Sequence, residues 1–165
     1  MTMTITPPPR SLCPLPYPLP GTGPDITLPA EFCAFHAIHQ RAYLAYADAH
    51  TPAGGDDLVR GVFGHLAVHW STLLSSPNPT ATAWNHVAAH IARRTPRLPL
   101  RTASPLHYQL TVLHHLANLS VTTAADTTGC DHATARCLLR ASGNSLSLPT
   151  ADERGTADGS LSGRP

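Results

Sequence analysis

The sequence predicts an all-α fold. The spacing of its apolar residues and the positions of its helix-breaking residues both support this. Apolar residues recur at steps of three and four along successive segments, which is the spacing of one helical face. Proline and glycine separate these segments, and no stretch alternates apolar and polar residues as a half-buried strand does. Because 42% of the 165 residues are hydrophobic, the chain can form one ordinary domain or two small helical ones.

The two ends of the chain differ in composition from its middle. Prolines crowd residues 7–29, and proline lacks a backbone donor and interrupts helices. We therefore expect residues 1–29 to form an extended, disordered arm. Residues 142–165 are small and polar and bury too little surface to offset the entropy of ordering, so we expect a disordered tail. The folded part is then about residues 30–141.

Three helices are expected between residues 30 and 94. The first covers about residues 31–49. The second begins at Asp56, where acids favour the positive end of the helix dipole, and ends near Leu74. The third covers about residues 80–94, and its inward face carries Ala83, Trp84, Val87, Ala88 and Ile91. Helices with broad apolar faces and short loops form a small bundle.

A basic linker, residues 95–103, follows the predicted bundle. The stretch around its start contains Arg93, Arg94, Arg97 and Arg101 and no acid. Such a cluster attracts phosphate groups. A solvated linker that happens to be basic explains the arginines equally well, because linkers between helical domains are often charged.

Residues 104–141 carry the signals of a helix-turn-helix. Ser104, Ser120 and Asp131 each suit the cap that begins a helix. Gly129 suits the tight turn between the last two helices, because glycine accepts a left-handed backbone. The spacing therefore predicts a short helix after Ser120 and a second one after Asp131.

The last of these helices is expected to present a polar and basic face to solvent. Ala135, Leu138 and Leu139 fall on its core side. The outward face carries His132, Thr134, Arg136 and Arg140. A face of this kind at the start of a recognition helix is what reading the DNA major groove requires. A plain helical hairpin in a bundle core is the alternative.

Two groups of residues, in this order, resemble a known family. The first group is Asp56-Asp57-Leu58-Val59, Val62-Phe63, Leu66, His69-Trp70, Ala83-Trp84 and Arg93-Arg94. The second group is Leu119-Ser120, Ala125, Gly129, Thr134 and Arg136. In order and spacing, residues 32–141 resemble the extracytoplasmic-function sigma factors, the small two-domain members of the bacterial primary-sigma superfamily.

The resemblance implies a transcription initiation factor made of two helical domains. Residues 30–94 would be a bundle that is similar to region 2 of the family and binds core RNA polymerase. Residues 104–141 would be similar to region 4 and read upstream promoter DNA, and an anti-sigma factor would be a further partner. The polymerase contacts that it implies are Asp56, Asp57, Leu58, Val59, Phe63 and Leu66. Trp84, Arg93 and Arg94 would lie near melted DNA, where stacking and phosphate contacts act together.

Some positions depart from the pattern of the family. Arg60 and Gly61 stand where the family usually has a Gln-Glu pair, and Leu138 stands where a basic residue is usual. The second domain has no net charge from its Arg136 and Arg140 against two aspartates. A degenerate sigma-like regulator, which binds DNA or protein without initiating transcription, is therefore an alternative. A protein-interaction bundle without a DNA role is another.

Catalysis, metal binding and membrane insertion find little support in the sequence. No nucleophile elbow, phosphate-binding glycine loop or paired catalytic carboxylates occur, so we expect neither an enzyme nor a cofactor. Histidine pairs spaced by four, His65/His69 and His86/His90, lack a fixed third ligand, so we expect no metal site. No apolar run could span a bilayer and prolines replace a signal-peptide core, so we expect a cytoplasmic protein.

The cysteines are expected to be free thiols. Cys13 falls in the proline-rich arm, and none of the four cysteines has CxxC spacing with another. In a cytoplasmic protein the reducing compartment disfavours disulfides. We therefore expect no structural disulfide.

Overall fold

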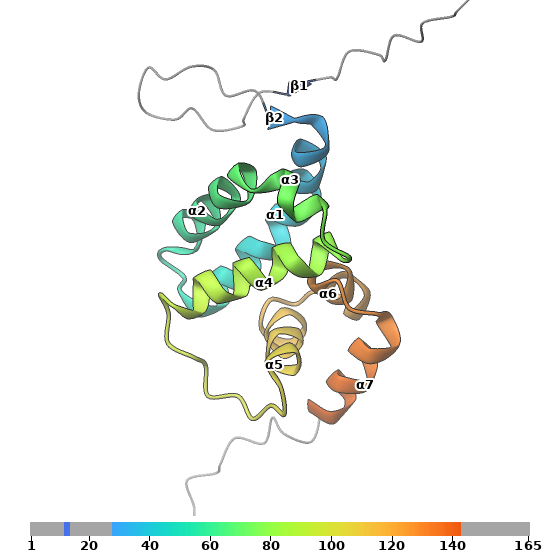
Figure 1. Cartoon of the computed structure of the whole chain (residues 1–165). Coiled ribbons are helices and arrows are strands. Elements are labelled where there is room, and N and C mark those ends of the chain that lie inside the picture. The colour runs from blue at the N-terminus through green and yellow to red at the C-terminus, as the bar shows by residue number, and fades with distance from the viewer. Residues whose placement is uncertain (1–11, 14–27, 143–165) are drawn as a thin grey trace, which may run out of the picture.

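The fold is a set of packed helices, as predicted, with one small pair of strands near the N-terminus (Figure 1). A computed structural model of the chain describes residues 12–13 and 28–142. Its helices, in chain order, are α1 (Ala30–His50), α2 (Gly55–Val68), α3 (Trp70–Leu74), α4 (Pro79–Ala92), α5 (Pro105–Thr111), the π-helical turn η1 (Val112–Leu116), α6 (Val121–Thr128) and α7 (His132–Ser142). The predicted helices of residues 31–49 and 80–94 correspond to α1 and α4.

A bend at His69 divides the second predicted helix into α2 and α3. The backbone there has φ −103° and ψ 18°, which lies outside the helical range. The bend lets Trp70 and Leu73 of α3 turn into the core, where they are 7% and 4% exposed. A continuous helix from Asp56 to Leu74, as expected from the sequence, is therefore wrong at this one position.

Part of the proline-rich arm is a strand pair. β1 (Leu12–Cys13) and β2 (Leu28–Pro29) run antiparallel, with Leu12 opposite Pro29 and Cys13 opposite Leu28. Leu28 is 6% exposed and belongs to the hydrophobic core. The expectation that residues 1–29 form a disordered arm without strands is wrong at these positions, because two-residue strands are too short to show alternation. The rest of the arm and residues 143–165 lie outside the described residues.

The expectation of free cysteines is wrong for Cys33, which is disulfide-bonded in α1. Cys130 and Cys137 are free thiols, as predicted. The sequence argument used spacing and compartment, and neither carries information about which side chains meet in space.

Side-chain caps begin the three helices at which the sequence predicted them. The side chain of Ser104 accepts a hydrogen bond from His107 N at 3.1 Å, and that of Ser120 accepts one from Thr123 N at 3.0 Å. Asp131 accepts one from Thr134 N at 2.8 Å. These caps satisfy backbone donors that have no partner within the first turn of a helix. All three predicted caps are confirmed.

One hydrophobic core joins the helices of both predicted halves. Trp84, Tyr43 and Phe32, from the first half, are its largest fully buried side chains. Leu110 and Leu113, from the second half, are also fully buried and belong to the same cluster. Because the halves share this core, their division into separate domains at residues 95–103 stays a prediction.

The two halves also meet closely where the turn between α6 and α7 lies against the start of α4. A Cβ placed on Gly129 would lie 2.5 Å from the backbone N of Ala81. The side-chain amide of Asn78 donates to the carbonyl of Gly129 at 2.8 Å. The turn glycine is therefore a packing element as well as a conformational one.

Candidate nucleic-acid interface

Local features of the sequence explain how the α6–α7 pair folds. Ala124 and Ala125 are fully buried, which lets α6 approach its neighbours closely. Gly129 has φ +69° and ψ 20°, the left-handed conformation expected for the turn. Thr128 Oγ1 donates to the carbonyl of Ala124 at 2.9 Å, so the hydroxyl of this residue, in the last turn of α6, is paired within the helix. Asp131 then starts α7.

The outward face of α7 carries three of the four residues predicted for it. Ala135 is fully buried and Leu139 is 7% exposed, and these two anchor the helix in the core. Leu138, also expected inside, is half-buried. The predicted contact residues His132, Thr134, Arg136 and Arg140 are all exposed. His132, Arg136 and Arg140, spaced by four residues, therefore share one accessible helix face, whereas the Thr134 side chain bonds back to Asp131 at the start of the helix.

The acids near this face already have local partners. Thr134 donates to Asp131 from both its hydroxyl and its backbone N–H, and these bonds hold the pKa of Asp131 below its usual value. His132 Nε2 lies 2.7 Å from Asp126 Oδ1. Arg136 and Arg140 form no ion pair within the described part of the chain. Both guanidinium groups are therefore available to an external anion.

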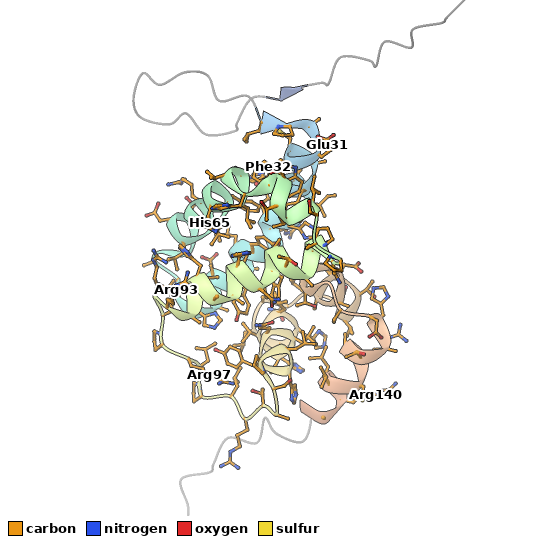
Figure 2. The ribbon with its side chains drawn as sticks, in the orientation of Figure 1. Glu31, Phe32, His65, Arg93, Arg97 and Arg140 are labelled. Carbon is orange, nitrogen blue, oxygen red and sulfur yellow. The ribbon has the colours of Figure 1, made fainter. Side chains whose placement is uncertain are left out.

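Arg93 and Arg94 lie far from the α7 face. They follow the C-terminal end of α4, whereas Gly129 contacts Ala81 at its N-terminal end. A helix of this length spans about 20 Å. Figure 2 shows Arg93 and Arg140 on opposite sides of the molecule. The structure does not bring the two predicted DNA-binding groups into one surface.

Trp84 lies in the core, which corrects the expectation that it stacks against melted DNA. Its side chain is 1% exposed, and its Nε1 donates to Gln109 Oε1 at 2.8 Å. Its ring contacts Tyr43 and Tyr46, with centroids 5.6 Å and 4.9 Å away. Neither face of the indole is open to a nucleobase.

The predicted polymerase-contact residues divide into exposed and buried groups. Asp56 and Asp57 are exposed and Leu58 is half-buried. Val59 and Phe63 are 7% and 6% exposed, but they line a surface hollow of about 220 Å³ between α1 and α2. Leu66 is fully buried, which corrects the expectation that it touches a partner.

Arg60, one of the residues that depart from the family pattern, pairs with the two acids at the start of α2. Arg60 forms an ion pair with Asp56 and another with Asp57, the latter at 2.8 Å. All three side chains are exposed, so these pairs contribute little to stability. They do neutralise the local charge that a basic partner would meet. The hollow also contains His36 and Arg41 of α1, which the sequence alone did not indicate.

The predicted histidine pairs gather between α2 and α4. The ring of His65 lies 4.5 Å from that of His69 and 5.4 Å from that of His86, measured between centroids. Burial and the neighbouring His69, His86 and Arg93 lower the pKa of His65. No group of three or more His, Cys, Asp or Glu residues in the described ranges is arranged to hold a metal ion.

We expect the protein to lose stability as the pH falls through the range in which free histidine titrates. Burial lowers the pKa of His39 below its ordinary value of 6.5, although Asp126 opposes the shift. The unfolded chain therefore binds a proton more readily than the folded one, so this stability is complete above about pH 6.5 and is lost below it. Urea midpoints measured at about pH 7.5 and about pH 5.5 should show this fall. The variant His39→Gln should show a smaller fall, and an equal or larger one would contradict the assignment.

No family model matches the chain, and no curated protein or solved structure matches it either. The resemblance to sigma factors therefore depends on the residues quoted above. None of the helices in the part that the structure describes has the length and apolar character needed to cross a membrane.

Proposed function

We propose that this chain is a DNA-binding protein of sigma type, in which α7 is the recognition helix of a helix-turn-helix. The observation that carries the proposal is the exposed face of α7, with Arg136 and Arg140 unpaired among the described residues. An α-helix fits the major groove of B-form DNA, and arginine binds both guanine edges and phosphate oxygens.

The surroundings of α7 support this role. Ala135 and Leu139 fix the helix against the core, so that its outward side chains are held by a rigid scaffold. The acids nearest the face are held by Thr134 and His132, and this local pairing reduces their repulsion of phosphate.

The activity that we propose for such a protein is promoter recognition with core RNA polymerase as partner. The hollow between α1 and α2 is the surface that we assign to the polymerase, since Val59 and Phe63 offer apolar contact beside the exposed Asp56. Arg93 and Arg94, about 20 Å from the Gly129 turn by the length of α4, would provide a separate phosphate contact.

Arg60 favours a second candidate, a sigma-like regulator that binds DNA without initiating transcription. It neutralises Asp56 and Asp57 at the edge of the proposed polymerase surface. A pull-down with core RNA polymerase separates the candidates, because only the initiation factor retains the enzyme. If the acids serve polymerase binding, Arg60→Gln should increase retention by freeing them.

We expect the double variant Arg136→Ala with Arg140→Ala to bind DNA at least about tenfold more weakly than the unaltered chain. Each arginine lost removes a phosphate or base contact, so the dependence of affinity on salt should also become shallower, by about 0.9 per phosphate contact in a logarithmic plot. Fluorescence anisotropy with a duplex from upstream of the protein's own gene measures both effects.

Arg41→Ala is the matched control for this experiment. Arg41 is an exposed arginine that lines the hollow between α1 and α2, and it is not part of the α7 face. Its removal should leave DNA affinity unchanged within error. Equal affinity of the double variant and the unaltered chain would contradict DNA reading by α7 and would favour a protein-interaction bundle.

A further inference from the structure

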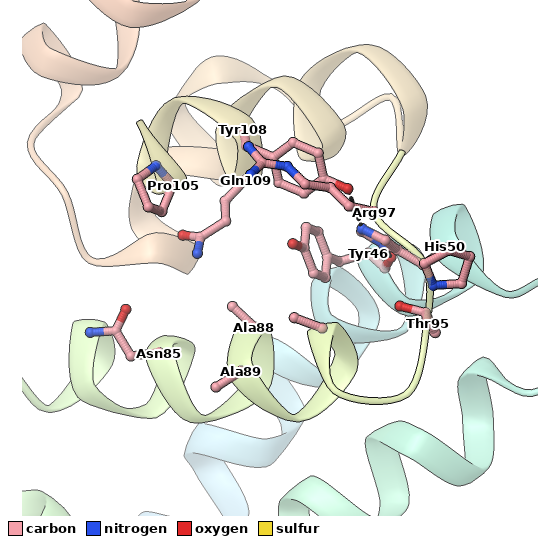
Figure 3. A pocket seen from close by; sticks show the side chains of 12 residues that line it. Tyr46, His50, Asn85, Ala88, Ala89, Thr95, Arg97, Pro105, Tyr108 and Gln109 are labelled. Carbon is pink, nitrogen blue, oxygen red and sulfur yellow. Dashed lines mark hydrogen bonds between the residues drawn. The ribbon is translucent and has the colours of Figure 1, made fainter. Parts of the chain in front are cut away.

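A second cavity lies between the two predicted halves of the chain and has no part in the proposed DNA contact. It has a volume of about 300 Å³ and is lined by residues of α1, α4, α5 and the segment before α5. Figure 3 shows Tyr46 and Tyr108 on its inner wall, with Ala88 and Ala89 of α4 facing them. Tyr46, Tyr108 and Ala88 are buried, whereas Asn85 and Arg97 are exposed at the rim.

A chain of hydrogen bonds fixes the aromatic wall. His50 Nδ1 lies 2.8 Å from the carbonyl oxygen of Tyr46 and therefore carries the proton that it donates there. In the neutral ring, Nε2 then accepts from Tyr108 Oη at 2.9 Å. Tyr108 Oη in turn accepts from Leu98 N at 3.0 Å. These bonds hold the Tyr108 ring in place, and the Tyr46 ring packs against those of His50 and Trp84, with centroids 4.6 Å and 4.9 Å away. Fixing the wall before any ligand arrives lowers the entropic cost of binding.

Two polar groups on this wall are directed into the cavity. Tyr46 is 3% exposed, and Figure 3 shows its hydroxyl pointing into the space between α4 and α5. A hydroxyl in this position can donate a hydrogen bond to a ligand or accept one from it. The Oε1 of Gln109 is occupied by Trp84 Nε1, which leaves the Gln109 NH₂ group facing the space beside Asn85 (Figure 3).

The residues that line the cavity carry positive but no negative charge. Arg97 is the one charged side chain among the lining residues, and no acid is among them. Its guanidinium lies 4.6 Å from the centroid of the Tyr108 ring, so it is held at the rim by a cation–π contact. A guanidinium binds a carboxylate through two parallel hydrogen bonds.

We propose that this cavity binds a small aromatic carboxylate with a single ring. The tyrosine rings and the alanines of α4 offer apolar and aromatic contact to the ring. Arg97 pairs with the carboxylate at the rim, while Tyr46 Oη and the Gln109 amide hydrogen-bond a polar substituent at the inner end. A volume of about 300 Å³ is at the small end of ligand pockets, which suits one ring rather than a nucleotide.

Isothermal titration calorimetry of the full chain with 4-hydroxybenzoate tests the proposal. We expect saturable binding, and we expect the neutral isostere 4-hydroxybenzamide to bind at least about tenfold more weakly because it cannot pair with Arg97. In the variant Arg97→Gln, 4-hydroxybenzoate should lose at least about tenfold in affinity, and the two compounds should bind alike. Ala89→Leu, which fills the cavity from its exposed edge, should also weaken binding of both compounds.

Arg93→Gln is the matched control, because Arg93 is an exposed arginine nearby that does not line the cavity. Near-ultraviolet circular dichroism of each variant establishes that its aromatic core is intact. Binding that is unchanged in Arg97→Gln, or equal affinity of the unaltered chain for the two compounds, overturns the assignment of a carboxylate. Absence of saturable binding of 4-hydroxybenzoate overturns the site. The double variant Arg136→Ala with Arg140→Ala should bind 4-hydroxybenzoate with unchanged affinity, because neither residue lines the cavity, so the outcome is separate from that of the DNA-binding proposal.

Discussion

Replacing Gly129 with alanine should lower the free energy of unfolding by about 3 kcal/mol. Two costs combine in this value. A side chain at φ +69° strains the backbone, at about 1–2 kcal/mol for a residue other than glycine. The new Cβ would also lie 2.5 Å from Ala81 N and 2.9 Å from Ala81 Cα, so backbone must move. Urea denaturation followed by circular dichroism measures the loss.

Two further variants separate the costs at Gly129. Gly129→Asn should be less destabilising than Gly129→Ala, because asparagine tolerates the left-handed region, yet its Cβ meets the same backbone. Gly64→Ala is the matched control, since Gly64 is an exposed helical glycine whose added Cβ meets nothing within 4 Å. It should stabilise the protein by about 0.5–1 kcal/mol. A Gly129→Ala variant as stable as the unaltered chain would contradict the close packing of the turn on α4.

The sequence alone predicted the features that depend on residues close together in the chain. Ser104, Ser120 and Asp131 cap helices where predicted, because a cap bonds a backbone donor only a few residues along the chain. Gly129 is left-handed where the turn was predicted. The exposed face of α7 likewise follows from helical periodicity, which needs no knowledge of the rest of the fold.

Features that depend on distant residues could not be predicted in this way. The packing of Gly129 against Ala81 and the disulfide of Cys33 both depend on where separate segments meet. The cavity beside Tyr46 and Tyr108 is a case of the same kind. Its tyrosines come from α1 and α5, and Arg97 comes from the segment between α4 and α5. No local spacing in the sequence connects these three residues.

Trp84 shows how two sequence arguments can conflict. Its spacing with Val87 and Ile91 places it on the inward face of α4, whereas the family resemblance places it beside melted DNA. The structure agrees with the spacing, since all three side chains are buried. Periodicity reports directly on burial, but a resemblance transfers a role from a different molecule, where the same residue type can face another way.

The replacement Trp84→Phe should therefore destabilise the fold without weakening DNA binding. It removes part of a fully buried ring and leaves Gln109 Oε1 without its 2.8 Å partner. We expect a loss of about 2–3 kcal/mol in the free energy of unfolding, since both a cavity and an unpaired acceptor result. Urea denaturation measures this loss, and anisotropy below the unfolding transition measures DNA affinity. An affinity that falls while the fold stays intact would instead restore Trp84 as a DNA contact.

Tyr43→Phe is the matched control, because it also removes one polar group from the same aromatic cluster. Tyr43 is fully buried and stacks on Phe63 at 5.3 Å, and its hydroxyl has no hydrogen-bond partner among the described residues. Burial raises the pKa of this hydroxyl, as expected for a group whose charged form is poorly solvated. Removing this hydroxyl breaks no hydrogen bond among the described residues. It also removes the cost of keeping a polar group away from water, so Tyr43→Phe should be neutral or stabilising. The difference between the two variants then comes from the Trp84–Gln109 bond and the lost indole volume, which together join α4 to α5 across the two halves of the chain.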